Sequence, residues 1–83
     1  MRARVFITPK KGVLDPPGKA VEHSLHALGF GEAHDVHLGK YIEVSLALTD
    51  RARAEQRMDE MCRKLLANTV IENYRFELER AAD

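Results

Sequence analysis

The chain has 83 residues, 45% hydrophobic and 31% charged, which is the composition of one small globular domain. A domain of this length buries only about 60–65% of the surface that its unfolded chain exposes, which argues against a deep, self-contained active site. Thirteen basic residues balance thirteen acidic residues. Nucleic-acid binding and attachment to an anionic membrane both draw on a basic excess, so this balance argues against both classes.

The single cysteine, Cys62, excludes an internal disulfide framework. The first residues contain no apolar core long enough for a signal peptide. No apolar run approaches the ~20 residues of a membrane-spanning helix. We therefore expect a cytoplasmic protein.

The first half of the chain predicts a strand followed by a helix. Residues 2–8 alternate, with Ala3, Val5 and Ile7 on one mainly apolar face, and residues 10–14 form a loop. Asp15 suits a helix N-cap and Pro16 suits the first helical position, while Gly29 suits the end of the helix. Between these signals an apolar stripe recurs at helical spacing, through Val21, Leu25 and Leu28.

The middle segment, residues 36–49, carries large aliphatic side chains at its even positions, interrupted by Lys40. One long strand with a bend at Gly39 places these aliphatics on one face. A hairpin with a three-residue loop at 39–41 preserves the same parity. Both arrangements fit the sequence, and we favour the long, bent strand.

The second half predicts another helix and a last strand. Thr49 or Asp50 is the N-cap, Asn68 is the stop, residues 70–79 alternate as a strand, and residues 80–83 form a tail. The helix stripe comprises Ala54, Met58, Met61, Cys62, Leu65 and Leu66.

The order β-α-β(β)-α-β predicts an α+β fold in one domain over residues 1–83. We expect a two-layer sandwich, in which an antiparallel sheet carries both helices on one face.

Motifs for catalysis and cofactor binding are weak. No GxxxxGK[ST] phosphate loop occurs, and His23 and His26, at i and i+3, have no acidic or cysteine cluster to complete a metal site. Cys62 lies within an apolar stripe without an identifiable activating base, and is interpreted as a structural thiol. Glu43 is interpreted as a residue on the polar face of a strand, and Glu72 as a residue beside a strand start. We expect no catalytic residue, metal or cofactor in this chain.

Three stretches together resemble the PurS family, the small subunit of phosphoribosylformylglycinamidine synthase. They are residues 11–21 (KGVLDPPGKAV) with 25–30 (LHALGF), residues 36–43 (VHLGKYIE), and residues 61–68 (MCRKLLAN) with 70–74 (VIENY). The chain departs from the family pattern at Pro17, where glutamine is more usual, and at Thr69, where proline is expected. Both are turn or helix-start positions, so they bear on local geometry more than on function.

The resemblance implies a role in purine biosynthesis, within a ligase that converts formylglycinamide ribonucleotide, glutamine and ATP into formylglycinamidine ribonucleotide. It implies a homodimer, or a tetramer in isolation, that is non-catalytic and bridges two partners. A PurL-like synthetase subunit would bind ATP and magnesium, and a PurQ-like glutaminase subunit would release ammonia. The alternatives are a small dimeric metabolite-binding regulatory module, suggested by fold analogy, and a small enzyme using His23, His26 or Cys62.

Two segments are candidates for contact with these partners. The apolar residues beside two prolines in the first loop suit docking, although Leu14 would also suit a hydrophobic staple onto the first helix. In the middle segment, a lysine interrupts an apolar face beside a tyrosine, a residue typical of interface anchors; the alternative is a bend whose lysine extends into solvent. The candidates are Val13, Leu14, Asp15, Pro16 and Gly18, with Gly39, Lys40 and Tyr41.

Overall fold

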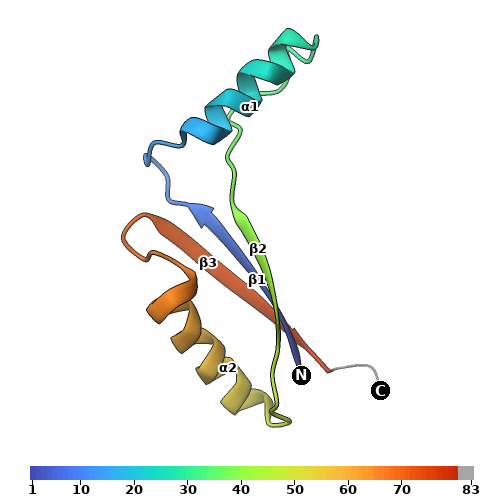
Figure 1. Cartoon of the computed structure of the whole chain (residues 1–83), viewed down its shortest axis with the longest axis vertical. Coiled ribbons are helices and arrows are strands. Elements are labelled where there is room, and N and C mark those ends of the chain that lie inside the picture. Colours follow the sequence, from blue (N-terminus) through green and yellow to red (C-terminus); the bar gives the residue numbers. More distant parts are fainter. Residues whose placement is uncertain (81–83) are drawn as a thin grey trace.

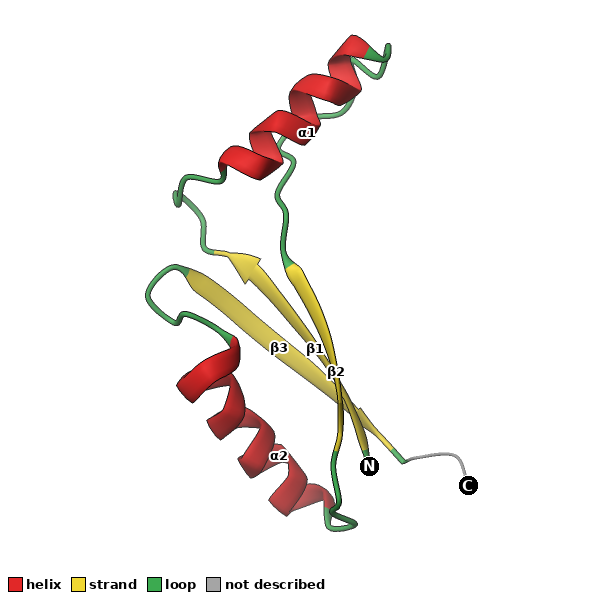
Figure 2. Cartoon of the chain, in the orientation of Figure 1, coloured by secondary structure: helices red, strands yellow, loops and turns green. Residues whose placement is uncertain are grey.

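The structure, a computed structural model, describes residues 1–80. Figures 1 and 2 show a small sheet with one helix beside it and a second helix beyond its end. Within the described residues, the elements are β1 (Arg2–Pro9), α1 (Pro16–Ala27), β2 (Lys40–Ser45), α2 (Arg51–Met61), a π-helical turn η1 (Cys62–Leu66), and β3 (Glu72–Glu79).

The three strands form one antiparallel sheet in the order β2-β1-β3. Val5 of the central strand pairs with Ile42 on one side and with Phe76 on the other. This register places alternate apolar side chains of all three strands on the face that α2 covers. The predicted α+β class and the antiparallel sheet are confirmed.

The core lies between β1 and α2. Asp50 caps α2 by accepting a hydrogen bond from the Ala52 amide at 3.1 Å. The fully buried side chains include the inward-facing residues of β1 and the apolar residues of α2 and the following turn: Ala3, Val5, Ile7, Ala54, Met58 and Cys62.

The end of the second helix differs from the predicted stripe. The Ala67 amide donates to the Cys62 carbonyl at 2.9 Å, so the last turn is π-helical and contains one extra residue. This extra residue rotates the following side chains about the helix axis. Cys62 is buried as predicted, whereas Leu65, predicted to share its face, is 82% exposed.

The prediction that both helices cover one face of the sheet is wrong for α1. This helix lies beyond the end of the sheet, and its only buried residue is Gly18 (Figure 1). The helix is instead tied to the segment that returns to β2, through the side chains of Asp15 and Glu22. We call residues 10–39 the arm.

The prediction of a long, bent middle strand is also wrong in its length. The segment forms one strand without a hairpin, but β2 spans Lys40–Ser45, and residues 36–39 lead into it without strand pairing. Lys40 pairs with Ile7, where the pairing of β2 with β1 ends, and the next residues of β1 are Thr8 and Pro9. Because proline has no amide hydrogen, Pro9 cannot donate a hydrogen bond that would extend the pairing of β1 with β2.

The last strand forms as predicted but begins at Glu72, two residues later than expected. Residues 81–83 of the predicted tail lie outside the described residues. Neither helix within residues 1–80 has the length and apolar character that crossing a bilayer requires.

Candidate partner-docking site

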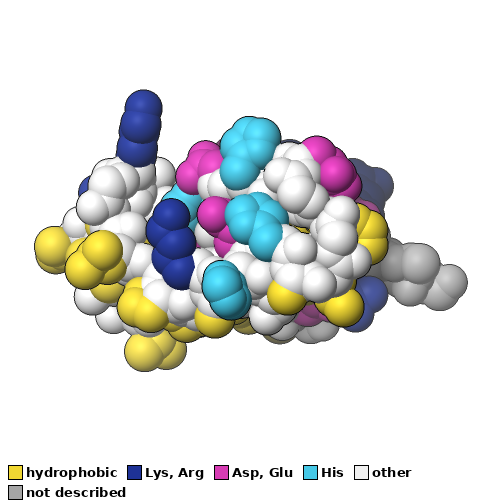
Figure 3. Space-filling model, turned by 90° about the horizontal axis from the view of Figure 1, so that it is seen from above, with side chains coloured by type: hydrophobic (Ala, Val, Ile, Leu, Met, Phe, Trp, Pro, Cys, Tyr) yellow, Lys and Arg dark blue, Asp and Glu magenta, His cyan; other side chains and the backbone are white. Residues whose placement is uncertain are grey.

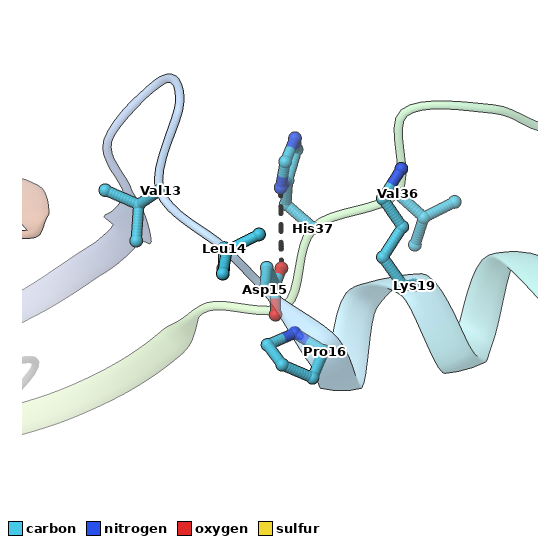
Figure 4. Close-up of a pocket in the computed structure, with 7 residues that line it drawn as sticks. All are labelled: Val13, Leu14, Asp15, Pro16, Lys19, Val36 and His37. Carbon is cyan, nitrogen blue, oxygen red and sulfur yellow. Dashed lines mark ion pairs between the residues drawn. The ribbon is translucent and has the colours of Figure 1, made fainter.

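The base of the arm contains an open, mainly apolar pocket of about 410 Å³ (Figure 4). The loop after β1 and the first turn of α1 form one wall, and the returning segment forms the other. The lining residues are Val13, Leu14, Asp15, Pro16, Lys19, Val36 and His37. Four of the eight predicted contact residues therefore meet at one site.

Leu14 is strongly exposed at this pocket, with 90% of its surface accessible. The alternative interpretation, a hydrophobic staple that packs back onto α1, is excluded by this exposure. Leu14 and its neighbours Val13 and Pro16 therefore present apolar surface at the base of the arm.

Asp15 holds the two walls of the pocket together. Its Oδ1 accepts a hydrogen bond from the Gly18 amide at 3.0 Å, which caps α1. Its Oδ2 accepts from the Leu38 amide at 2.9 Å and lies 3.4 Å from Nδ1 of His37. These donors, the Leu38 amide foremost, hold the pKa of Asp15 below its ordinary value because they stabilise the ionised carboxylate.

Gly18 is required by packing inside the arm. A Cβ atom at this position would collide with the Asp15 carboxylate and would lie 2.6 Å from the Val36 carbonyl oxygen. About one turn further along α1, Glu22 Oε1 accepts a hydrogen bond from the Val36 amide at 3.1 Å. This bond also lowers the pKa of Glu22. Two carboxylates thus tie α1 to the returning segment.

The second predicted segment, residues 39–41, does not form a single site. Gly39 packs its backbone against the Ile7 carbonyl. Lys40 Nζ lies 3.4 Å from the Leu66 carbonyl and 3.7 Å from Glu72 Oε2, so it links β2 to the end of η1 and to the start of β3. The lysine of this bend thus has protein partners, although its side chain remains half exposed.

Tyr41 points to the sheet face opposite α2. Its ring lies 5.2 Å from that of Phe6, and the Arg75 guanidinium stacks over the Phe6 ring at 4.0 Å. This open face is otherwise lined by cross-strand ion pairs, such as Arg2 with Glu43 at 2.9 Å. Tyr41 is therefore separated from the pocket at the base of the arm.

Sequence reasoning missed Lys19, Val36 and His37 as pocket residues. His37 lies between Asp15 and Asp35, whose Oδ1 is 3.0 Å from its Nε2. The separation of His37 from Asp15 along the chain gave no signal of this contact, which depends on how the arm folds back on itself. Histidines gather with acidic side chains at the α1 end of the molecule (Figure 3).

The described residues do not support a metal or nucleophile site. Within residues 1–80, no group of three or more His, Cys, Asp or Glu side chains is placed to hold a metal ion. Cys62 is fully buried, and burial raises the pKa of its thiol, as does the nearby charge of Asp59. A protonated, inaccessible thiol is a poor nucleophile.

Comparison with known proteins identifies the family. The model of the family described as "PurS: Phosphoribosylformylglycinamidine (FGAM) synthase" matches residues 2–80. The PurS subunit of Bacillus subtilis (strain 168) is 47% identical over 78 residues, covering 94% of this chain and 92% of that protein. The PurS subunit of Synechocystis sp. is 51% identical over 75 residues, covering 90% and 75% of the two chains.

Solved structures of PurS proteins have the same fold as this chain. The structure of Bacillus subtilis PurS superposes with a TM-score of 0.85 and covers 95% of this chain and 98% of its own. A chain in the structure of PurLQS from Thermotoga maritima, 24% identical, shares the fold with a TM-score of 0.83, over 92% of this chain and 93% of its own. This chain belongs to the PurS family, the PurS subunits of phosphoribosylformylglycinamidine synthase.

Proposed function

We propose that this chain is the non-catalytic assembly subunit of a cytoplasmic phosphoribosylformylglycinamidine synthase, bridging a PurL-like synthetase subunit and a PurQ-like glutaminase subunit. ATP and magnesium belong to the synthetase subunit. One observation carries the bridging role: the apolar pocket (Figure 4) lies at the base of the arm, and Figure 1 shows this arm projecting clear of the sheet, within reach of a second protein. Family membership and the fold shared with a chain of PurLQS support it.

The docking residues are Val13, Leu14 and Pro16. Leu14 is 90% exposed in the free chain, so full burial of its side chain against a partner contributes about 1.5–3 kcal/mol to the free energy of binding. The adjacent Pro16 and Pro17 restrict the backbone, so little conformational entropy is lost when a partner binds. These features favour a preformed docking site.

Reconstitution with the two partner subunits tests this role. We expect that the partners without this chain use ammonia but not glutamine, and that adding the chain restores glutamine-dependent amidation. Leu14→Ser should raise the concentration of the chain needed for half-maximal activation. Val70→Ser is the matched control, because Val70 is 80% exposed but lies in the turn before β3. Full glutamine-dependent activity without the chain would refute the proposal.

The proposal includes a homodimer, which the dimensions of the chain support. Its radius of gyration is 16.2 Å, whereas a compact domain of 83 residues has about 12 Å. Large apolar side chains are exposed at the end of α1 and in the π-helical turn after α2, among them Leu28 at 73% and Leu65 at 82%. An isolated chain of this shape exposes apolar surface to solvent, and packing against a second copy would bury that surface.

A groove next to α2 suits the α1 helix of the second copy. It has a volume of about 420 Å³ and lies on the sheet face where a two-layer sandwich would carry its other helix. Its lining combines four apolar side chains with three charged ones: Val44, Met61, Leu65 and Leu66, with Arg57, Glu60 and Lys64. The apolar stripe of α1, which the sheet of its own chain leaves uncovered, matches this groove in character.

A further inference from the structure

Asp15 is placed to shape the docking pocket, not to touch a partner. Its side chain is only 9% exposed, and both carboxylate oxygens accept hydrogen bonds from backbone amides inside the arm. We propose that Asp15 is a positioning residue, which fixes α1 against the returning segment and so holds the pocket in the shape that the partner subunit binds. This inference rests on the proposed docking function.

The chemistry of the contact requires an aspartate. The Gly18 and Leu38 amides are both donors, and they approach different oxygens of one short side chain, at 3.0 and 2.9 Å. Asparagine supplies one acceptor oxygen and one NH₂ donor, so one amide would face another donor. Asp15→Asn therefore removes one of the two bonds while changing the size of the side chain very little.

A second contact, between Glu22 and the Val36 amide, keeps the arm folded when a bond to Asp15 is lost. Glu22 still accepts from the Val36 amide in such a variant, so α1 and the returning segment stay joined at that point. The buried core is formed by β1, α2, the π-helical end of the second helix and β3, and includes no residue of the arm. We therefore expect Asp15→Asn to change the angle between the two pocket walls while leaving the sheet intact.

Hydrogen exchange separates positioning from folding. In Asp15→Asn, the Gly18 or the Leu38 amide, whichever faces the new NH₂ group, should exchange faster, while the amides of β1 and β3 keep their protection. Loss of protection throughout the sheet would overturn the proposal, because Asp15 would then be needed for the fold. Asp35→Asn is the control, since Asp35 also contacts His37 but its side chain is 82% exposed.

Activation of the synthase supplies the functional readout. We expect Asp15→Asn to raise the concentration needed for half-maximal activation about tenfold, as expected for losing one charge-assisted hydrogen bond, and to leave activity at saturation unchanged. Asp35→Asn should leave both values unchanged. Reduced activity at saturation, with normal half-maximal concentration, would contradict a role in docking.

Comparison with Leu14→Ser distinguishes a wrong role for Asp15 from a wrong docking site. If Leu14→Ser weakens activation and Asp15→Asn does not, the pocket binds the partner but Asp15 does not position it. If neither variant weakens activation, the docking site itself is wrong. If Asp15 acts through the pocket, the double variant should lose less than the combined effect of the two single variants.

Discussion

The Tyr74 hydroxyl donates a 2.6 Å hydrogen bond to Asp59 Oδ1, which joins β3 to α2 across the edge of the core. Arg63 Nε donates to the other oxygen of the same carboxylate at 2.7 Å. The bond to Asp59 raises the pKa of Tyr74, and the bonds from Tyr74 and Arg63 lower the pKa of Asp59. One carboxylate thus connects the helix, its π-helical end and the last strand.

These shifts predict a flat stability profile at intermediate pH. The lowered pKa of Asp59 stabilises the fold above about pH 4, the unfolded value, and this contribution is lost as pH falls through the folded pKa. The raised pKa of Tyr74 stabilises the fold below about pH 10, and this contribution is lost as pH rises through the folded pKa. Urea unfolding across this range should show a constant contribution from the pair, which Tyr74→Phe removes.

Tyr74→Phe should lower the free energy of unfolding by about 1 kcal/mol at pH 7, because it removes the donor while keeping the ring. Tyr41→Phe is the matched control, since Tyr41 lies on the open face of the sheet and should change stability little. Equal losses from the two variants would show that the Tyr74 hydroxyl contributes nothing through Asp59.

Cys62 should resist alkylation in the native chain. Its side chain is fully buried, and burial raises the pKa of the thiol, so the reactive thiolate is scarce at pH 8. We expect iodoacetamide to modify the native chain at least about tenfold more slowly than the urea-unfolded chain. Similar rates in the two states would contradict the buried, structural role and would revive a nucleophilic one.

The strands and α2 could be predicted because their apolar side chains are covered within the chain. Alternation in residues 2–8 identified Ala3, Val5 and Ile7, and all three are fully buried. The apolar stripe of α1 was equally clear. An apolar stripe predicts that one face of a helix packs against another apolar surface. It does not show whether that surface belongs to the same chain. In this structure, α1 does not pack against the sheet of its own chain.

The candidate site was predicted in part for a similar reason. Val13, Leu14, Asp15 and Pro16 are consecutive, so any loop places them together. Residues 39–41 are also consecutive, but they enter a strand, where successive side chains point to opposite faces. The side chains of Lys40 and Tyr41 therefore point to opposite faces of the sheet. His37 contacts Asp15 because the arm folds back on itself, and the spacing of these residues in the sequence does not predict that contact.

Gly39→Ala should destabilise the fold by about 2 kcal/mol or more, because a Cβ atom there collides with the Ile7 carbonyl. That oxygen belongs to the central strand and cannot move without disturbing the sheet. Gly31→Ala is the matched control: a Cβ atom there meets nothing within 4 Å, so its effect should stay within about 0.5 kcal/mol. Urea unfolding measures both values, and equal effects would contradict the close approach of Gly39 to β1.

The homodimer proposal predicts complementation between two defective variants. Leu28→Asp places a charge at the end of α1, and Leu65→Asp places one in the groove beside α2. If α1 of each copy fills the groove of the other, a twofold dimer contains this contact twice. Each variant alone then has two damaged contacts, and both should dissociate at concentrations where the wild-type chain stays dimeric in sedimentation experiments.

Mixing the two variants gives a different outcome. In the heterodimer, α1 of the Leu28→Asp chain meets the groove of the Leu65→Asp chain, so both charges fall in one contact. The other contact then joins an unaltered α1 to an unaltered groove. We expect the mixture to dimerise more tightly than either variant alone, with Val70→Asp as a control that dimerises normally. A mixture no tighter than its components would show that α1 does not fill the groove of a second copy.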